Sequence, residues 1–236
     1  MSRRQILTLS EVLQTTRDTV RTLSTLGFKC CLVGSVACSC YGMSRSPNVH
    51  SVIRTSTLLV LGCRFTQEEL KRRVVAANTS FYLIASKDPY ATYKVLWYRL
   101  PGYRRSCKVD LLFPGIMNIP PVPSNSIVHR RHPSDYQTLP LMPFIPLLLL
   151  KLQAWMDHGE SPKYYMNAKQ PTDVRDITEL LNIFVTAGNL GELGSWIPES
   201  FLKAGRSRRR EFVKLYPHTA NHWSRVKQRH ALDARK

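Results

Sequence analysis

A glycine and a serine close an apolar segment near the start of this 236-residue chain. Phe28 to Val33 is rich in β-forming residues and predicts a buried strand, and Gly34-Ser35 then opens a short predicted helix over residues 36–41. At such a turn, backbone N–H groups and a small hydroxyl can hold a phosphate, and glycine permits close approach of the backbone. The same pair also serves the steric needs of a strand-to-helix turn, so the spacing alone does not decide between the two roles.

An aspartate within a later apolar segment is the second candidate for chemistry. Residues 107–113 predict a strand in which Val109, Leu111 and Phe113 form an apolar stripe. Lys108 and Asp110 share its other face, and a carboxylate there is costly unless it meets a polar cleft or a partner. Asp110 is therefore either an acid that faces a cleft or half of an ion pair at the sheet surface, with Lys108 or an arginine.

Helix and strand signals indicate the elements that position these residues. Thr8 with Glu11, and Thr66 with Glu69, have the spacing of capping boxes, which predicts helices over residues 9–26 and from 66 to about 77. Strands are expected over residues 81–85, 92–100 and 107–113. A strand over residues 48–53 would place Asn48, His50 and Val52 on one face.

The composition changes after residue 113. Prolines mark an irregular connection, and residues 124–140 read as an exposed loop. Helices are expected over residues 144–158 and 173–187, with a shorter pair between 190 and 214. These patterns predict an α+β fold with an α/β domain over residues 1–138, a helical region over 139–205 and a basic tail over 206–236.

Several short motifs occur in a fixed order between residues 28 and 181. They are Leu32-Val33-Gly34-Ser35, Tyr41-Gly42-x-x-Arg45-x-Pro47-Asn48, Tyr93-Lys94-Val95-Leu96-Trp97-Tyr98, Cys107-Lys108-Val109-Asp110, Leu149-Leu150-Lys151-Leu152-Gln153-Ala154-Trp155 and Asp173-Val174-x-Asp176-Ile177. This ordered set resembles the nucleotidyltransferase superfamily that shares its catalytic domain with DNA polymerase β. More narrowly, it resembles a fungal group of nucleotidyltransferase-like proteins related to bacterial abortive-infection toxins. The resemblance implies a small mixed sheet with flanking helices, followed by a helical region.

The resemblance also implies a reaction that uses two Mg²⁺ ions. Two acids at i and i+2 on one strand, with a third acid on a neighbouring strand, would hold the metals against a nucleoside triphosphate. Gly34 and Ser35 would contact the nucleotide phosphates, Asp110 would be the third, catalytic and metal-binding acid, and Lys151 would meet a phosphate. Lys151 is otherwise an ordinary lysine on a helix face. Asp173 and Asp176 are expected to favour the start of their helix through its dipole.

The chain departs from this pattern at the first two acids. Asn48 and His50 stand where the acid-x-acid pair belongs, and no Asp or Glu occurs from residue 29 to 67. Mg²⁺ prefers charged oxygen ligands and rarely binds an amide and an imidazole. The chain is therefore expected to be a pseudoenzyme that retains nucleotide binding, unless the segment from Asn48 to Cys63 is wrongly predicted from its gene.

Charge and cysteine usage bear on the partners and the compartment. The net charge is +18, and residues 201–236 hold eleven Lys or Arg against two acids. A non-catalytic protein that binds nucleic acid through its basic C-terminal tail is thus the alternative function, and a solvated basic end is the plainer interpretation. The six cysteines match no zinc spacing and read as buried thiols of an intracellular protein, cytoplasmic or nuclear. With no leader-like segment and no membrane-spanning run, no membrane partner is expected.

Overall fold

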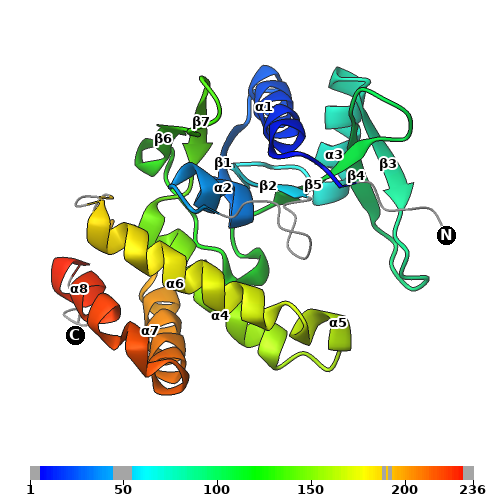
Figure 1. Cartoon of the computed structure of the whole chain (residues 1–236). Helices are drawn as coiled ribbons and strands as arrows, with labels where there is room; N and C mark the ends of the chain where they lie inside the picture. Colours follow the sequence, from blue (N-terminus) through cyan, green and yellow to red (C-terminus); the bar gives the residue numbers. More distant parts are fainter. Residues whose placement is uncertain (1–5, 45–54, 188–189, 191–192, 231–236) are drawn as a thin grey trace.

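Seven strands form one mixed sheet in the part of the chain that the computed structural model describes, namely residues 6–44, 55–187, 190 and 193–230. The strands are β1 (Lys29–Val33), β2 (Thr55–Leu61), β3 (Phe81–Ala85), β4 (Lys94–Arg99), β5 (Ser106–Leu112), β6 (Val128–Arg131) and β7 (Thr138–Leu141). Their order across the sheet is β3-β4-β5-β2-β1-β7-β6 (Figure 1). β2 is antiparallel to β1 and parallel to β5, so the Gly-Ser turn and the Asp110 strand flank one central strand.

Two helices pack on one face of this sheet, and both begin at the predicted caps. α1 (Leu9–Thr25) starts with a complete capping box in which the Glu11 backbone N–H donates to Thr8 Oγ1 and the Thr8 N–H donates to Glu11 Oε2. α3 (Gln67–Ala77) is capped by the Thr66 side chain. Each cap satisfies N–H groups that the first helical turn leaves without partners, which is why the helices begin there.

A hydrogen bond between α1 and β2 shows which side chains of the sheet face α1. Thr16 Oγ1 of α1 lies 2.9 Å from Ser56 Oγ of β2, and both side chains are buried. Because successive strand residues point to opposite faces, Thr55 and Thr57 point away from α1. Asp110 is paired with Thr57 in the parallel β2–β5 register and shares that opposite face.

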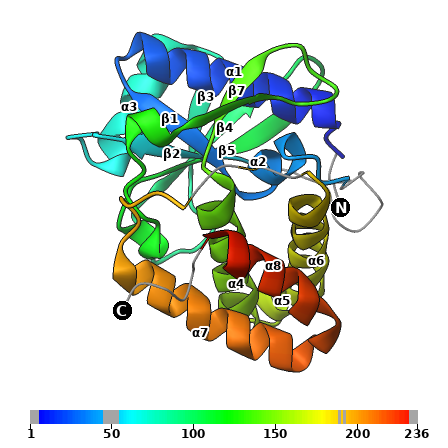
Figure 2. The same cartoon turned by 90° about the vertical axis from the view of Figure 1, so that its left-hand side faces the viewer.

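The second half of the chain is mostly helical. α4 (Phe144–Gly159) packs against α6 (Gln170–Thr186) and α7 (Glu199–Leu215), while α8 (Ala220–His230) lies against α6 (Figure 2). The short helices α2 (Gly34–Cys40) and α5 (Tyr164–Asn167) also contact α4. The Tyr41 hydroxyl donates to the Met142 carbonyl at 2.8 Å, and its ring meets Phe144 edge-on at 5.1 Å, which ties the end of α2 to the start of α4.

This arrangement confirms the predicted α+β class, a mixed sheet with flanking helices followed by a helical region. All six cysteines are free thiols and all except Cys63 are buried, as expected. Burial raises the pKa of Cys30 and of Cys40 to about 12. None of the described helices has the length and apolar character that crossing a membrane requires.

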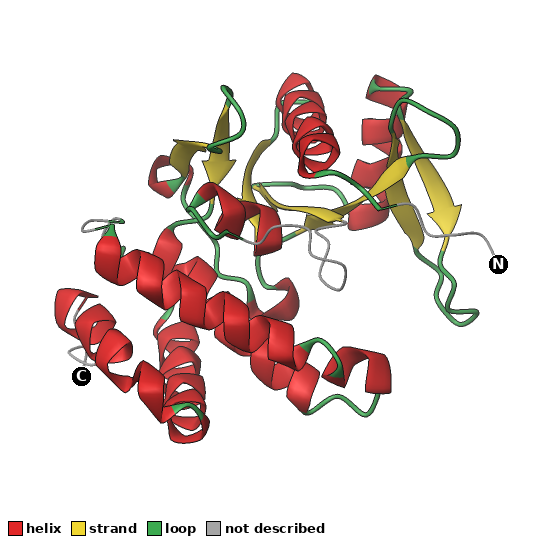
Figure 3. Ribbon diagram, viewed as in Figure 1, coloured by secondary structure: helices red, strands yellow, loops and turns green. Residues whose placement is uncertain are grey.

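The prediction of an exposed loop over residues 124–140 is wrong in part. Its residues include β6 and the start of β7, which pair with each other at the edge of the sheet beyond β1 (Figure 3). Pro140 sits within β7 opposite His129, although proline cannot donate a ladder hydrogen bond. Each strand is only four residues long, and the prolines and polar residues hide the alternation that identifies longer strands.

The C-terminal basic segment is helical as far as it is described. α7 continues through position 205, where the sequence places a boundary between the helical region and the tail. Phe212 of α7 is fully buried and meets Trp155 of α4 edge-on at 5.0 Å, and Trp223 of α8 is also buried. Gly205 lets α7 approach α4 closely, because a Cβ there would lie 3.0 Å from Leu149. Residues 206–226 therefore pack onto the helical region, and the domain limits stay a prediction.

Candidate functional site

The turn after β1 brings Gly34 beside the central strand. Gly34 has a φ of +68°, a backbone conformation that residues with a side chain rarely adopt. A Cβ at this position would lie 3.9 Å from both Cβ and Oγ1 of Thr57, an ordinary contact. The glycine is thus required by the turn and not by lack of space. Ser35, the next residue, lies in the first turn of α2 and is partly exposed.

Thr57 lies between the two candidates that the sequence singles out. It pairs with Val33 of β1 on one side and with Asp110 of β5 on the other. Adjacent strands are about 4.8 Å apart, so Thr57 and Asp110 are immediate neighbours on the sheet face that points away from α1. The structure therefore brings Gly34 and Asp110 to either side of one threonine, although they are far apart in sequence.

Asp110 is held by the lysine two residues before it. Lys108 Nζ lies 2.9 Å from Asp110 Oδ1 and 3.0 Å from Oδ2. Both side chains are more than a third exposed, at 38% and 34%, so the pair is a surface ion pair and contributes little to stability, about 0–1 kcal/mol. This is the pairing that the sequence offers as the plainer role of Asp110. It also places an ammonium group, beside the carboxylate, on the face that carries Thr57.

Asn48 and His50, the expected remnants of the acid pair, lie outside the described residues. The described strand next to Asp110 presents Thr55 and Thr57, which are two residues apart and share its face. Sequence reasoning missed these threonines because it placed the motif strand at residues 48–53 and looked for charged or metal-binding types. The strand itself had a signal, since residues 58–61 are a β-forming apolar run.

The described residues at this position do not fit a Mg²⁺ ion. They offer one carboxylate, already paired with Lys108, and two neutral hydroxyls, whereas Mg²⁺ is usually bound through carboxylates with near-octahedral geometry. Within the described ranges, no group of three His, Cys, Asp or Glu side chains is arranged to hold a metal. The Mg²⁺ ions that the family resemblance implies gain no support from these side chains.

Lys151, the expected phosphate ligand, is buried among carboxylates of the helical region. Its Nζ donates to Asp176 Oδ2 at 2.6 Å and lies 3.9 Å from Asp173 Oδ1, and only 8% of the residue is exposed. Burial acts to lower the pKa of Lys151, but the Cys38 sulfur and the two aspartates outweigh it and raise that pKa. Lys151 is thus a buried, charged side chain whose ammonium group forms an ion pair with Asp176.

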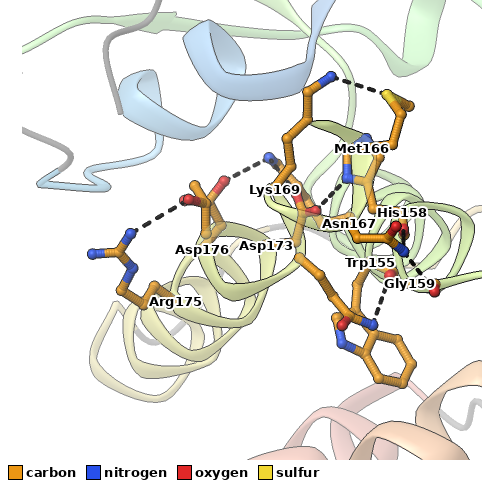
Figure 4. Close-up of polar contacts among 12 residues, drawn as sticks. Trp155, His158, Gly159, Met166, Asn167, Lys169, Asp173, Arg175 and Asp176 are labelled. Atoms are coloured by element: carbon orange, nitrogen blue, oxygen red, sulfur yellow. Dashed lines mark hydrogen bonds and ion pairs between the residues drawn. The ribbon is translucent and has the colours of Figure 1, made fainter. Parts of the chain in front are cut away.

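The two aspartates do more than favour the start of α6. Both are buried, and Asp173 also accepts a hydrogen bond from, or donates one to, Nδ1 of His158 (Figure 4). Asn167 Nδ2 donates to the carbonyls of His158 and Gly159 at 2.9 Å, which holds the end of α4 against the following turn. The group formed by Lys151, His158, Asp173 and Asp176 therefore joins α4 to α6.

A nucleotidyltransferase-like protein from Paracoccidioides brasiliensis, described as antigenic, superposes over 92% of this chain and 94% of its own, with a TM-score of 0.67 and 13% identity. The chain has a nucleotidyltransferase-like fold. Terminal uridylyl transferase 4 from Trypanosoma brucei with bound GTP matches over 90% of this chain and 67% of its own, at 13% identity and a TM-score of 0.34, too low to bear on the fold. The sequence matches no protein-family model and no curated protein.

Proposed function

We propose that this chain is a nucleotidyltransferase-like pseudoenzyme that binds a nucleoside triphosphate without a metal ion. The nucleotide phosphates would contact Gly34 and Ser35 and extend toward the β2–β5 face. The observation that carries the proposal is Thr57, an uncharged residue that stands between Gly34 and Asp110 on the strand next to the Asp110 strand. The fungal relationship and the link to abortive-infection toxins remain predictions from the motifs.

The charge balance at this face supports anion binding. Three acids would place about three negative charges here, which repel phosphates unless Mg²⁺ neutralises them. The described face instead carries Asp110 and Lys108, whose charges cancel, next to two hydroxyl groups. A triphosphate therefore meets no net repulsion at this face, and Lys108 and the Ser35 hydroxyl can each donate a hydrogen bond to it.

The test is calorimetric titration of the full chain with ATP and with GTP, in the presence of Mg²⁺ and of EDTA. We expect binding at or below millimolar concentration that is the same in both buffers, because no metal takes part. Ser35→Trp should weaken it at least about tenfold, since the indole would fill the space beside Gly34. Ser207→Trp, on the exposed side of α7, is the matched control and should leave binding unchanged.

Two results would remove the proposal. One is the absence of binding by any nucleotide at millimolar concentration. The other is binding that disappears in EDTA, which would mean that residues outside the described face complete a metal site. If the Ser35→Trp chain keeps its fold by circular dichroism and binds the nucleotide with full affinity, the nucleotide does not bind at the turn after β1.

A second candidate function is nucleic-acid binding through the basic C-terminal segment. Lys203, Arg210 and Lys214 are exposed and, at spacings of seven and four, share one side of α7. Deletion of residues 206–236 is a poor test, because it also removes the buried Phe212 and Trp223. The triple change of these three cations to Gln keeps the packing, and it should abolish salt-sensitive binding to RNA or DNA if α7 is the contact surface.

A further inference from the structure

The outer half of the sheet combines aromatic and basic side chains at high density. Residues 81–108, which span β3, β4 and the start of β5, contain seven aromatic residues, six Lys or Arg and a single acid. Aromatic residues make up 9% of the whole chain and a quarter of this segment. A core needs some of these rings, and Phe81 and Tyr98 are buried together against α3 and α1. The remaining rings and the cations need another explanation.

Several of them form one row across the sheet. Tyr82 of β3 is paired with Trp97 of β4, Trp97 with Lys108 of β5, and Lys108 with Thr55 of β2. Directly paired residues on neighbouring strands point to the same face, and strands are about 4.8 Å apart. The row therefore places two aromatic rings, an ammonium group and a hydroxyl side by side.

This row lies on the face that α1 and α3 do not cover. Phe81, Leu96 and Tyr98 point into the core, so their neighbours Tyr82 and Trp97 point the opposite way. Tyr82, Trp97 and Lys108 are each partly exposed, and Ile84, on the same face, is 48% exposed. The Arg99 guanidinium sits over the Tyr82 ring at 4.9 Å from its centroid. Rings and cations are thus interleaved where solvent reaches them.

We propose that the row Tyr82–Trp97–Lys108, with Arg99, is a binding surface for single-stranded nucleic acid. Unpaired bases would stack on Trp97 and on the Tyr82–Arg99 pair, while the cations contact the phosphates. A duplex keeps its bases stacked on each other and offers no such faces, so the surface selects single strands. Lipid is disfavoured because the exposed rings alternate with charges and form no continuous apolar patch.

The position of the row gives the surface a direction. Its Lys108 end adjoins Thr55 of β2, and Thr57 and Asp110 follow on the same two strands. A strand lying along the row would therefore lead its end toward the face proposed to bind the nucleotide. The surface shares Lys108 with that face, but its stacking residues Tyr82, Trp97 and Arg99 have no part in the proposed nucleotide contacts.

The experiment is fluorescence anisotropy of a labelled ten-nucleotide oligo(U) or oligo(dT) titrated with the full chain at low salt. Stacking energies per base predict that Trp97→Ala weakens binding about five- to 150-fold. Trp97→Phe, which keeps a ring, should retain most of the affinity. Tyr164→Ala on α5 removes an aromatic residue that is 86% exposed elsewhere, and it should change the affinity less than about twofold.

The charge-reversal variant Arg99→Glu tests the same surface without removing a ring, so its result does not depend on whether the ring variants fold. Arg99 is exposed, and Arg99→Glu should weaken binding and reduce the slope of log K against log salt by about one. The proposal is overturned if the oligonucleotide does not bind, or if Arg99→Glu and Trp97→Ala bind as the unaltered chain does. Loss of binding only in the Lys203, Arg210 and Lys214 triple variant would assign it to α7. ATP titration of the ring variants should be unchanged, which separates this proposal from the nucleotide site.

Discussion

Lys151→Met distinguishes a structural lysine from a phosphate-binding one. The substitution keeps most of the length of the side chain and removes its charge, which takes away the ammonium group that lies 2.6 Å from Asp176, a residue only 3% exposed. Removing one partner of a buried ion pair typically costs about 3–5 kcal/mol, because the other charge stays buried. For a chain of this size, each kcal/mol lowers the midpoint of thermal unfolding by about 2–4 °C. We therefore expect a fall of roughly 6–20 °C.

Lys108→Met is the matched control, since the same change is made to an exposed pair. Lys108 and Asp110 are both more than a third exposed, so its loss should cost at most about 1 kcal/mol and lower the midpoint by no more than about 4 °C. The assay is circular dichroism melting of both variants at neutral pH, with ATP titration of the Lys151→Met chain.

One result would refute this reasoning about Lys151. It is a Lys151→Met chain that has the same midpoint of thermal unfolding as the unaltered protein but binds ATP more weakly. That result would restore the phosphate-binding role that the resemblance implies. A second variant adds Asp176→Asn to Lys151→Met. It should recover part of the lost stability, because the buried carboxylate that pairs most closely with Lys151 is then replaced by a neutral amide.

Two further predictions follow from the α1 cap and from the central strand. Hydrogen bonding to Arg105, opposed by burial and helped by the Thr8 backbone, lowers the pKa of Glu11 from 4.5 to about 2. A pKa that is lower in the folded state gives stability that is complete above pH 4.5 and is lost as the pH falls toward 2. In the Glu11→Gln chain, the urea concentration at the midpoint of unfolding should therefore change less with pH between 4.5 and 2. The double change Thr55→Asp/Thr57→Asp should create Mn²⁺ or Mg²⁺ binding measurable by calorimetry, whereas Asn48→Asp/His50→Asp should do so only if residues 48–50 reach Asp110. Divalent binding by the second variant and not by the first would assign the acid positions to residues 48 and 50.

The parts of the fold with local chemical signals were predictable. Paired Thr and Glu residues fixed the starts of α1 and α3 to within a residue, because the signal and the structure it creates are only three residues apart. The alternation in residues 107–113 identified β5, one residue out of register with its bounds at Ser106–Leu112, and placed Asp110 on its partly exposed face. The four-residue strands β6 and β7 depend on pairing with distant partners, and their sequences carry little of that information.

The candidate site was predictable only for its unusual residues. A glycine at a strand end and an aspartate in an apolar strand are conspicuous in sequence, so Gly34 and Asp110 were found. Thr57 has no such mark, and only the β2 register shows that it lies between them. Lys151 was recognised as a candidate, but its burial depends on α6 folding over α4, a tertiary contact between residues 25 apart.

The position of β2 also bears on whether the chain is correctly read. An apolar run at residues 58–63 is hard to place if the motif strand occupies residues 48–53. This is the reason why the segment from Asn48 to Cys63 could be wrongly predicted from its gene. With β2 at Thr55–Leu61, Leu58, Leu59 and Val60 are fully buried; Leu58 and Leu59 pair with both β1 and β5, and Val60 pairs with β1. A random or intronic insertion would not supply a central strand with matched registers on two sides. The described part of the doubtful segment, residues 55–63, therefore belongs to the fold, and its register is what places Thr55 and Thr57 on the strand beside Asp110.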